Sequence, residues 1–214
     1  MTTHLSMNSA ASMRVPVYWL LAAVVLLPGL TACTVGPTAP APQRYDLGPP
    51  LPSVPNASTT GPRQVLALDL QTGPALDGTA MSFRLAYADE RQLRAYRDAR
   101  WAAPVGELLQ QRLRAALAAD FSLLPAGEVG TRTLVVEVLD MTQSFDRPDH
   151  STGVLRLRAT LLQRSSAGAT ITAQREGQWQ ADAPSADAAG GARAQQLAAD
   201  TAAGELSRWI SSLR

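Results

Sequence analysis

The chain contains a single cysteine, Cys33, within the stretch LTACTVG that runs from Leu30 to Gly36. A lone thiol can be a buried spectator, a free nucleophile, half of an intermolecular disulfide, or the target of a covalent modification. One cysteine excludes an intramolecular disulfide and any metal site built from several cysteines. The choice among the remaining roles depends on the two segments that flank Cys33, and their compositions differ sharply.

Only one other group of side chains has the residue types of a metal or catalytic site. Asp146, Asp149 and His150 occur together in FDRPDHSTG, and His150 is the only histidine after Cys33. Asp, Pro, Ser and Gly are also the usual residues of turns, so we interpret this stretch as a loop between two strands. An envelope hydrolase that uses Asp149 and His150 stays open as a remote alternative.

Composition and motifs argue against catalysis and against nucleic-acid binding. The chain has no nucleophile elbow, phosphate-binding glycine loop, His-Glu-x-x-His pair or EF-hand pattern. We therefore expect no enzyme, no cofactor and no bound metal. All 19 basic side chains are arginines, against 18 acidic ones, and Arg14 is the only charged residue before Cys33. The chain from Cys33 onward is thus neutral and offers no basic stripe for nucleic acid.

The segment before Cys33 has the three parts of a secretory signal peptide. Arg14 precedes an apolar run from Val15 to Leu27, and a helix-breaking Pro28-Gly29 follows it. The apolar run is shorter than the roughly 20 residues of a membrane-spanning helix. Leu30, Thr31 and Ala32, together with Cys33, resemble the bacterial lipobox, which consists of a Leu, two small residues and an invariant Cys. Met1, Met7 and Met13 all remain possible start residues.

This resemblance to a lipobox predicts that the thiol of Cys33 receives a diacylglycerol and that a peptidase cleaves before it. Several acyl chains on one residue make a stable membrane anchor, since each buried CH₂ contributes about 0.8 kcal/mol. Residue +2 is Thr34 rather than Asp, which favours the outer membrane, with the periplasmic leaflet of the inner membrane as the alternative. We expect a signal peptide over 1–32, a lipidated Pro-rich tether over 33–43 and a folded domain over 44–214.

The folded part shows two hydrophobic periodicities. Two helices are expected, one opened by Pro104 with an apolar stripe from Val105 to Leu117, and one over about 186–213. Residues 91–101 fit either an edge strand or a helical turn, and Gly177 is expected to mark a bulge. Apolar runs and alternating patterns predict strands over residues 44–47, 64–70, 81–87, 121–125, 132–141, 153–163 and 169–180.

Two helices cannot cover both faces of so many strands. We therefore predict an α+β domain with a mainly antiparallel sheet and both principal helices packed on one face. Trp101 and Trp209 are expected to anchor the core, while Arg156 and Arg158 are expected to lie on the solvated face. Asp89, Glu90 and Glu176 have no evident partners in the sequence, and we interpret them as solvated charges.

The succession of these features resembles a known family, the ABC-type transport auxiliary lipoproteins, which includes the paraquat-inducible protein C. The resemblance covers the chain from about Tyr45 to the C-terminus, together with the lipobox. Trp179 departs from it, because a Phe is expected there. The segments that carry it are RYDLGP, MSFRLAYADERQLRAYRDARWAAPVGELLQQRLRAAL, GVLRLRATLLQ, GATITAQREGQWQADAP and a Trp-bearing final helix.

The resemblance implies a non-catalytic role in a transport system. Members of the family act with an ABC transporter and MCE-domain proteins, in systems implicated in moving lipids or other hydrophobic molecules between the two membranes. It implies an outer-membrane-anchored periplasmic domain that docks the MCE assembly, and self-association is left open. The alternative is a direct lipid carrier that holds an acyl chain between the helices and the sheet.

Overall fold

The protein was analysed as a computed structural model, and this structure describes residues 41–49 and 62–213. The predicted signal peptide, the lipobox residues Leu30, Thr31 and Ala32, and the lipidation site Cys33 lie outside these residues. So does the greater part of the predicted tether, of which only residues 41–43 are described. The described residues thus belong almost entirely to the predicted folded domain.

The described residues form eight strands, three α-helices and one short 3-10 helix. Residues 91–101, which fitted two interpretations, belong to a strand. In chain order the elements are β1 (Gln43–Tyr45), β2 (Val65–Thr72), η1 (Pro74–Leu76), β3 (Ala80–Leu85), α2 (Ala86–Asp89), β4 (Glu90–Trp101), α3 (Val105–Leu117), β5 (Ser122–Leu123), β6 (Arg132–Arg147), β7 (His150–Ser165), β8 (Gly168–Asp182) and α4 (Ala188–Ser212).

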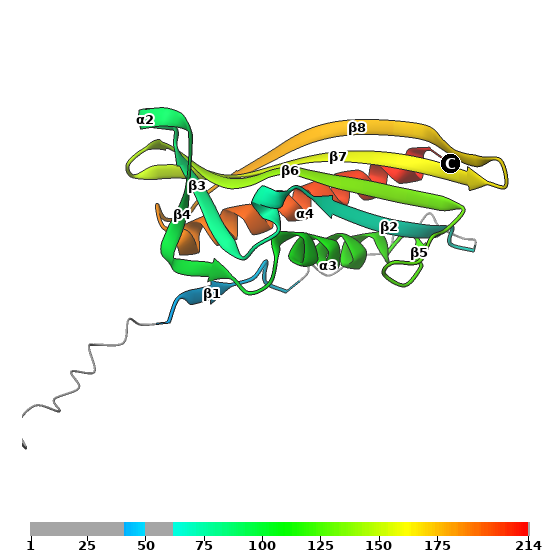
Figure 1. Cartoon of the computed structure of the whole chain (residues 1–214), viewed down its shortest axis with the longest axis horizontal. Helices are drawn as coiled ribbons and strands as arrows, with labels where there is room; N and C mark the ends of the chain where they lie inside the picture. Colours follow the sequence, from blue (N-terminus) through cyan, green and yellow to red (C-terminus); the bar gives the residue numbers. More distant parts are fainter. Residues whose placement is uncertain (1–40, 50–61, 214) are drawn as a thin grey trace, which may run out of the picture. The chain divides into compact units, whose positions relative to one another are not determined.

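All eight strands belong to one sheet organised around β6 (Figure 1). On one side β6 pairs antiparallel with β7, and β7 pairs antiparallel with β8. On its other side β6 pairs parallel with two strands, with β2 along its first half and with β3 near its end. The sheet continues from β2 to β5, and from β3 to β4 and then β1.

The sheet is mixed, so the prediction of a mainly antiparallel sheet was wrong. The β1–β4, β2–β5, β2–β6 and β3–β6 pairs are all parallel. Parallel neighbours need a long crossover connection, and the chain between β2 and β6 supplies one through β3, β4 and α3. Alternation of apolar residues shows which face of a strand is buried but not which way its neighbour runs. The α+β class itself is confirmed.

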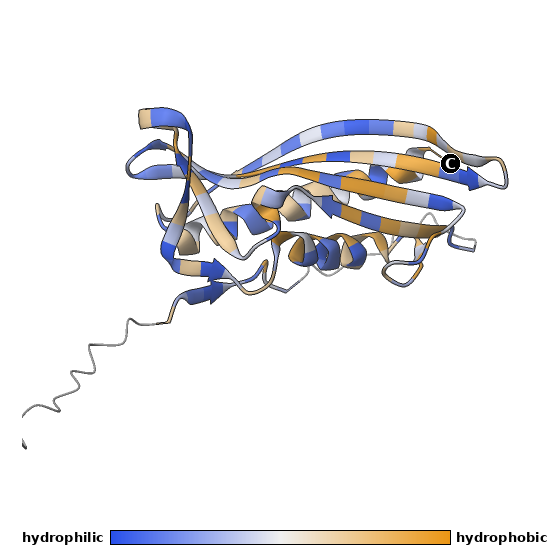
Figure 2. Cartoon of the chain, viewed as in Figure 1, coloured by the Kyte–Doolittle hydropathy of each residue, from blue (hydrophilic) through white to orange (hydrophobic). Residues whose placement is uncertain are grey.

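Both principal helices lie on the same face of the sheet, as predicted (Figure 1). Helix α4 packs along β7 and β8, while α3 packs against β2 and α4. Leu155, Leu157 and Leu161 of β7 point to this face and are almost fully buried. Each buried leucine contributes about 1.5–3 kcal/mol relative to an exposed one. Figure 2 shows hydrophobic residues concentrated along β2, β6 and β7, whereas β8 and α2 are mainly hydrophilic.

Helix α4 approaches the sheet closely because small residues line the contact. A Cβ added to Gly153 of β7 would lie 2.6 Å from the backbone nitrogen of Gln195, which leaves room for a hydrogen atom only. Ala194, Ala198 and Ala202 continue this contact along the helix, and all three are buried. The alanine-rich composition of the C-terminal segment therefore reflects a close helix-to-sheet distance.

Gly177 does not mark a bulge, because it pairs in regular register with Leu157. The irregularity of the β7–β8 pair lies instead between Leu161 and Leu162. Gly177 makes room for an indole ring, since a Cβ there would lie 2.5 Å from the ring of Trp179. Trp101 is buried as predicted, whereas Trp209 is half-buried and lies 5.9 Å from the guanidinium of Arg175.

Candidate functional site

The Asp-His stretch lies in the β6–β7 turn, where two of its three side chains meet. His150 Nδ1 lies 2.6 Å from Asp146 Oδ1, and this hydrogen bond lowers the pKa of the Asp146 carboxyl. Asp149 points instead toward Arg147, at 3.7 Å. Among the described residues no three His, Cys, Asp or Glu side chains gather as metal ligands would. The turn therefore places His150 between Asp146 and Asp182, the latter at 3.8 Å from Nε2, and leaves Asp149 apart from them.

The arginines of β7 lie on the face of the sheet that the helices leave open. Arg156 donates to Glu176 at 2.8 Å, and Arg158 reaches both Glu176 and Glu137 at about 3 Å. These bonds lower the pKa of the Glu176 carboxyl. The interpretation of Glu176 as a charge without a partner was wrong, because cross-strand neighbours cannot be read from one strand alone. Asp89 likewise pairs with Arg91, at 3.1 Å.

The strands β3 and β4, with α2 between them, form a two-stranded arm (residues 80–101). In Figure 1 this arm turns away from the rest of the sheet at the end that holds the β6–β7 turn. Its inner face is packed: the rings of Phe83 and Tyr96 lie 4.7 Å apart, and Tyr96 donates to Gln143 at 2.9 Å. Burial, together with the nearby Asp187 charge, raises the pKa of Tyr96 to about 12.

The outer face of the arm carries a row of exposed side chains, Arg91, Leu93, Ala95 and Arg97, which we call the arginine stripe. Alternation along β4 places Arg91, Leu93 and Ala95 on the face opposite Tyr96. Arg97 follows this row in the irregular stretch of β4 between Ala95 and Arg100, and its side chain is exposed. The side chains of Arg91 and Arg97 are 88% and 91% exposed, and Leu93 is 43% exposed. Their ionic partners are the sequence neighbours Asp89 and Asp98. Such exposed pairs contribute little to stability.

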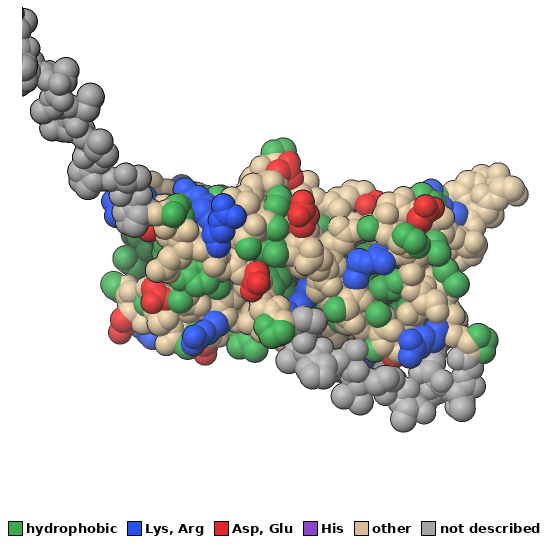
Figure 3. Space-filling model, turned by 90° about the horizontal axis from the view of Figure 1, so that it is seen from below, with side chains coloured by type: hydrophobic (Ala, Val, Ile, Leu, Met, Phe, Trp, Pro, Cys, Tyr) green, Lys and Arg blue, Asp and Glu red, His purple; other side chains and the backbone are tan. Residues whose placement is uncertain are grey.

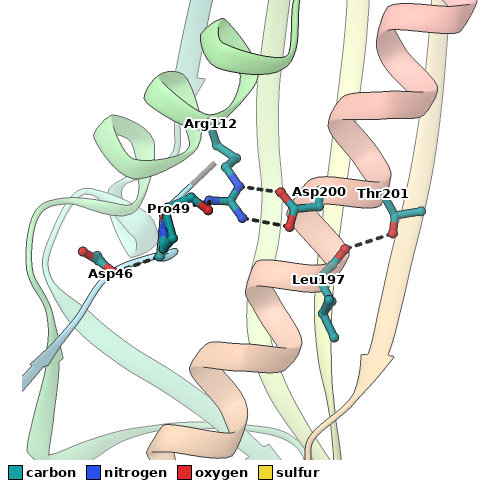
Figure 4. A network of polar contacts seen from close by, with 7 residues as sticks. Asp46, Pro49, Arg112, Leu197, Asp200 and Thr201 are labelled. Atoms are coloured by element: carbon teal, nitrogen blue, oxygen red, sulfur yellow. Dashed lines mark hydrogen bonds and ion pairs between the residues drawn. The ribbon is translucent and has the colours of Figure 1, made fainter. Parts of the chain in front are cut away.

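A second cluster, the clamp, joins the N-terminal segment to both principal helices (Figure 4). Arg112 of α3 makes a two-pronged ion pair with Asp200 of α4, with nitrogen–oxygen distances of 2.5 and 2.8 Å. The same guanidinium donates to the backbone carbonyls of Gly48 and Pro49, at 2.8 and 2.9 Å. The side chains of Arg112 and Asp200 are only 4% and 9% exposed. The charges are thus buried, paired and hydrogen-bonded.

The clamp holds the segment that follows β1 in a defined place. β1 pairs with the last residues of β4, and Leu47 is buried in the core just before the clamped carbonyls. Arg112 was not identified from the sequence as a buried residue of its helix. A signal was present, because Arg112 lies seven residues after Val105 and four after Leu108, on the buried stripe. Asp200 was not identified from the sequence at all.

Two open cavities lie at opposite ends of the domain. One, of about 380 Å³, lies beside the clamp between residues 46–48 and the start of α3. The other, of about 510 Å³, lies at the opposite end of the sheet, where Val65, Leu161, Ala173 and Leu213 surround it together with polar side chains.

Figure 3 shows the molecule from below, with a group of basic side chains at the end that holds β1 and β4.

Comparison with a model of the ABC-type transport auxiliary lipoprotein component gives a match over residues 45–207, most of the described chain. The protein belongs to this family. The match begins at the end of β1 and includes the arm, the clamp and nearly all of α4, so these features are parts of the family's own domain. The resemblance inferred from the sequence is thereby confirmed. No protein of curated function matches the chain.

Solved structures share the fold of this auxiliary lipoprotein. Protein XCC0632 from Xanthomonas campestris superposes with a TM-score of 0.69 at 20% sequence identity, over 80% of this chain and 95% of that one. An uncharacterized protein superposes with a TM-score of 0.61 at 14% identity, over 80% and 99% of the two chains. At such identities the likeness concerns the fold alone, and it extends over nearly the whole of both relatives.

Proposed function

We propose that this auxiliary lipoprotein is anchored in the outer membrane through acylated Cys33 and serves as a periplasmic docking component of an MCE transport system. In this role it assists an ABC transporter in moving lipids or other hydrophobic molecules between membranes, without catalysing a reaction itself. The observation that carries the proposal is the family match over residues 45–207. The MCE partner and the outer-membrane location extend that match.

The sequence supports a lipid anchor as the means of attachment. Leu30, Thr31 and Ala32 complete a lipobox before Cys33, and Thr34 favours the outer membrane over the inner one. Within the described residues no helix is long and apolar enough to cross a membrane. Signal peptide 1–32, tether 33–43 and domain 44–214 are then the three functional parts of the chain.

The clamp suits a protein that works at the end of a tether. Any pull on the membrane anchor reaches the domain through β1 and the clamped segment. Such a pull meets the β1–β4 pairing first, and Arg112 holds the segment behind β1 to α3 and α4. A docking component needs this rigidity, because its partner must meet it at a fixed distance from the membrane.

Replacement of the lipidated cysteine tests the proposal. In a Cys33→Ala strain we expect the protein to leave the membrane fraction and the envelope to lose its resistance to lipophilic agents. The acylated wild-type protein should retain an MCE-domain protein after crosslinking and purification. The proposal fails if the Cys33→Ala protein stays in the membrane fraction and supports normal function. A His150→Ala strain serves as the control and should behave as wild type, since a hydrolase is not proposed.

A second candidate function, direct carriage of a lipid, is favoured by the cavity of about 510 Å³ beside Leu161 and Leu213. An acyl chain would replace water against these apolar side chains. We would then expect phospholipid to co-purify with the detergent-free Cys33→Ala protein, and Ala173→Trp, which fills the cavity, to remove it. Protein that is free of lipid by mass spectrometry would leave docking as the only supported role.

A further inference from the structure

We propose that the arm lies on the membrane, with the arginine stripe of β4 bound to the anionic headgroups of the phospholipid surface in which Cys33 is anchored. This inference rests on the proposed lipidation of Cys33. It adds to the anchor a second contact that fixes the orientation of the domain. The surface is formed by Arg91, Leu93, Ala95 and Arg97 on the outer face of the arm, and its occupant is an anionic lipid bilayer.

The length of the tether places the arm within reach of the bilayer. Ten peptide units separate Cys33 from Gln43, the first residue of β1, and ten fully extended residues span at most about 36 Å. β1 pairs with Ala99, Arg100 and Trp101, at the base of the arm. The stretch of β4 from Glu90 to Ala99 is itself about 30 Å long, at 3.3 Å per residue. The whole arm is therefore within reach of a bilayer in which Cys33 is anchored.

The chemistry of the stripe fits an anionic lipid surface. Two almost fully exposed arginines flank Leu93 and Ala95 along the strand. Tyr87, which is 48% exposed, lies in α2 at the tip of the arm. Tyrosine and arginine are typical of the water–lipid boundary, because each combines an apolar body with a polar end. Phosphate oxygens can take over the exposed contacts of Arg91 and Arg97 with their neighbouring carboxylates, because such contacts are weak.

The free edge of β4 is consistent with this placement. Only residues 99–101 pair with β1. Of residues 90–98, Leu93, Arg94 and Ala95 pair with β3, and none of the nine pairs with a described strand on the other side. Charged side chains on an exposed edge oppose strand addition by another protein. At a lipid surface the same charges are favourable. The acyl chains already provide stable attachment, so the stripe would set the orientation of the domain rather than its overall affinity.

Fluorescent probes on the acylated full chain test the proposal, because acylation of Cys33 leaves no other thiol. Ala95→Cys places a probe within the stripe, and the matched control Ala167→Cys places one in the β7–β8 turn at the other end of the sheet. The vesicles contain phosphatidylethanolamine, phosphatidylglycerol and a headgroup-labelled quencher. We expect strong quenching at position 95 and little at position 167. Replacing phosphatidylglycerol by phosphatidylcholine should remove the difference.

A charge-matched pair of double variants identifies the groups responsible. Each arginine near an anionic surface contributes roughly fivefold to binding, so Arg91→Gln with Arg97→Gln should lower the ratio of docked to free arm by about 30-fold. Arg164→Gln with Arg208→Gln removes the same charge from exposed sites elsewhere and should have little effect. Equal quenching at both probe positions would overturn the proposal. The proposal would also be overturned if quenching at position 95 were the same in the stripe variant or with neutral lipid. It would be overturned as well if the signal of that probe changed only when another protein was added.

The same samples separate this proposal from the proposed function. If Cys33 carries no acyl chains, every variant stays in the supernatant when the vesicles are sedimented, and the anchoring proposal fails. The unacylated chain is then mixed with phosphatidylglycerol vesicles at low salt, where stripe-dependent sedimentation supports the membrane contact and its absence overturns it. If all variants sediment with the vesicles but position 95 is quenched no more than position 167, the lipid anchor is supported and the arm does not lie on the membrane.

Discussion

Arg112 connects three separate parts of the chain through one guanidinium group, and its removal should be costly. Arg112→Met leaves Asp200 as a buried charge without its partner and leaves two backbone carbonyls without their donor. Breaking a buried ion pair in this way costs about 3–5 kcal/mol. We expect urea unfolding to show a loss of that size, and an exposed control, Arg208→Met, to change the free energy of unfolding little.

A double variant shows whether stability requires the Arg112–Asp200 charges themselves or only side chains that fill their volume. Arg112→Met combined with Asp200→Leu removes both charges and fills much of their volume. Because the cost of burying the two ions disappears, this variant should recover most of the stability lost in Arg112→Met. A double variant no more stable than the single one would mean that the contacts to Gly48 and Pro49 matter more than the ion pair.

Asp187, at the start of α4, gives a pH-dependent contribution to stability. Its carboxylate accepts from the backbone N–H of Gly190 at 2.8 Å and from Ser185 at 2.7 Å, and these bonds lower its pKa. A lowered pKa stabilises the fold above the ordinary value of about 3.9 and stops doing so as the pH falls through the folded-state value. Asn also caps helices, so Asp187→Asn should cost only a fraction of a kcal/mol at neutral pH.

The measurement compares urea unfolding of wild type and Asp187→Asn across the acid range. The difference in free energy of unfolding should be constant near neutral pH and should vanish as the pH falls through the lowered pKa of the wild-type carboxyl. A difference that stays constant through this range would show that the charge of Asp187 has no part in stabilising α4.

At the scale of the elements, two glycines of α4 have opposite roles, Gly190 in its first turn and Gly204 in its C-terminal half. A Cβ at Gly190 would lie 1.9 Å from the backbone oxygen of Ser185, so Gly190→Ala must move the chain that leads into the helix. A Cβ at Gly204 meets nothing within 4 Å. We expect Gly190→Ala to destabilise the protein by about 1–3 kcal/mol. Gly204→Ala should stabilise it by roughly 0.5–1 kcal/mol, because alanine is the better helix former.

Thermal unfolding monitored by circular dichroism compares the two variants directly. Both replace glycine by alanine in the same helix, so they change the unfolded chain in the same way. Only the packing at the N-terminal end of α4 distinguishes them. A Gly190→Ala protein with the melting temperature of Gly204→Ala would show that the segment before the helix can move without cost.

The helices and strands themselves could be predicted from hydrophobic periodicity, but which strands pair, and in which direction, could not. Alternation placed Leu155, Leu157 and Leu161 on the buried face of β7 correctly. The parallel pairing of β2 and β3 with one strand was missed, because the same alternation fits either direction. The segment of β4 was ambiguous for a physical reason as well. Most of the strand is exposed, so it lacks the alternation of apolar and polar residues that identifies a half-buried strand.

The candidate sites also differ in whether the sequence alone reveals them, because some are contiguous in the chain and others are assembled by the fold. Cys33 and its lipobox form a contiguous signal that needs no fold to be read, although they lie outside the described residues. The clamp joins residues 48, 112 and 200, and only tertiary structure brings them together. Its one local sign was a charged residue on the apolar stripe of α3.

At the scale of the whole molecule, the proposed anchor and the proposed membrane contact of the arm would be linked to the helices through the clamp. In this proposal the tether keeps the base of the arm near the bilayer and the arginine stripe orients the arm. The clamp, which joins the segment after β1 to α3 and α4, would then fix the helices relative to that segment. A partner docked on the domain would then meet a surface of fixed height and direction. This arrangement depends on a short connection between Cys33 and β1.

Lengthening that connection should therefore uncouple orientation from attachment. Inserting twenty Gly and Ser residues between Pro40 and Ala41 triples the distance along the chain from Cys33 to β1. The effective concentration of the arm at the bilayer falls roughly as the −3/2 power of linker length, which gives about a fivefold decrease. Acylation and membrane fractionation should stay unchanged, while quenching of the probe at position 95 decreases. Quenching that persists at the wild-type level would mean that the stripe binds lipid strongly enough without the anchor, and its affinity would then be measurable on the unacylated chain.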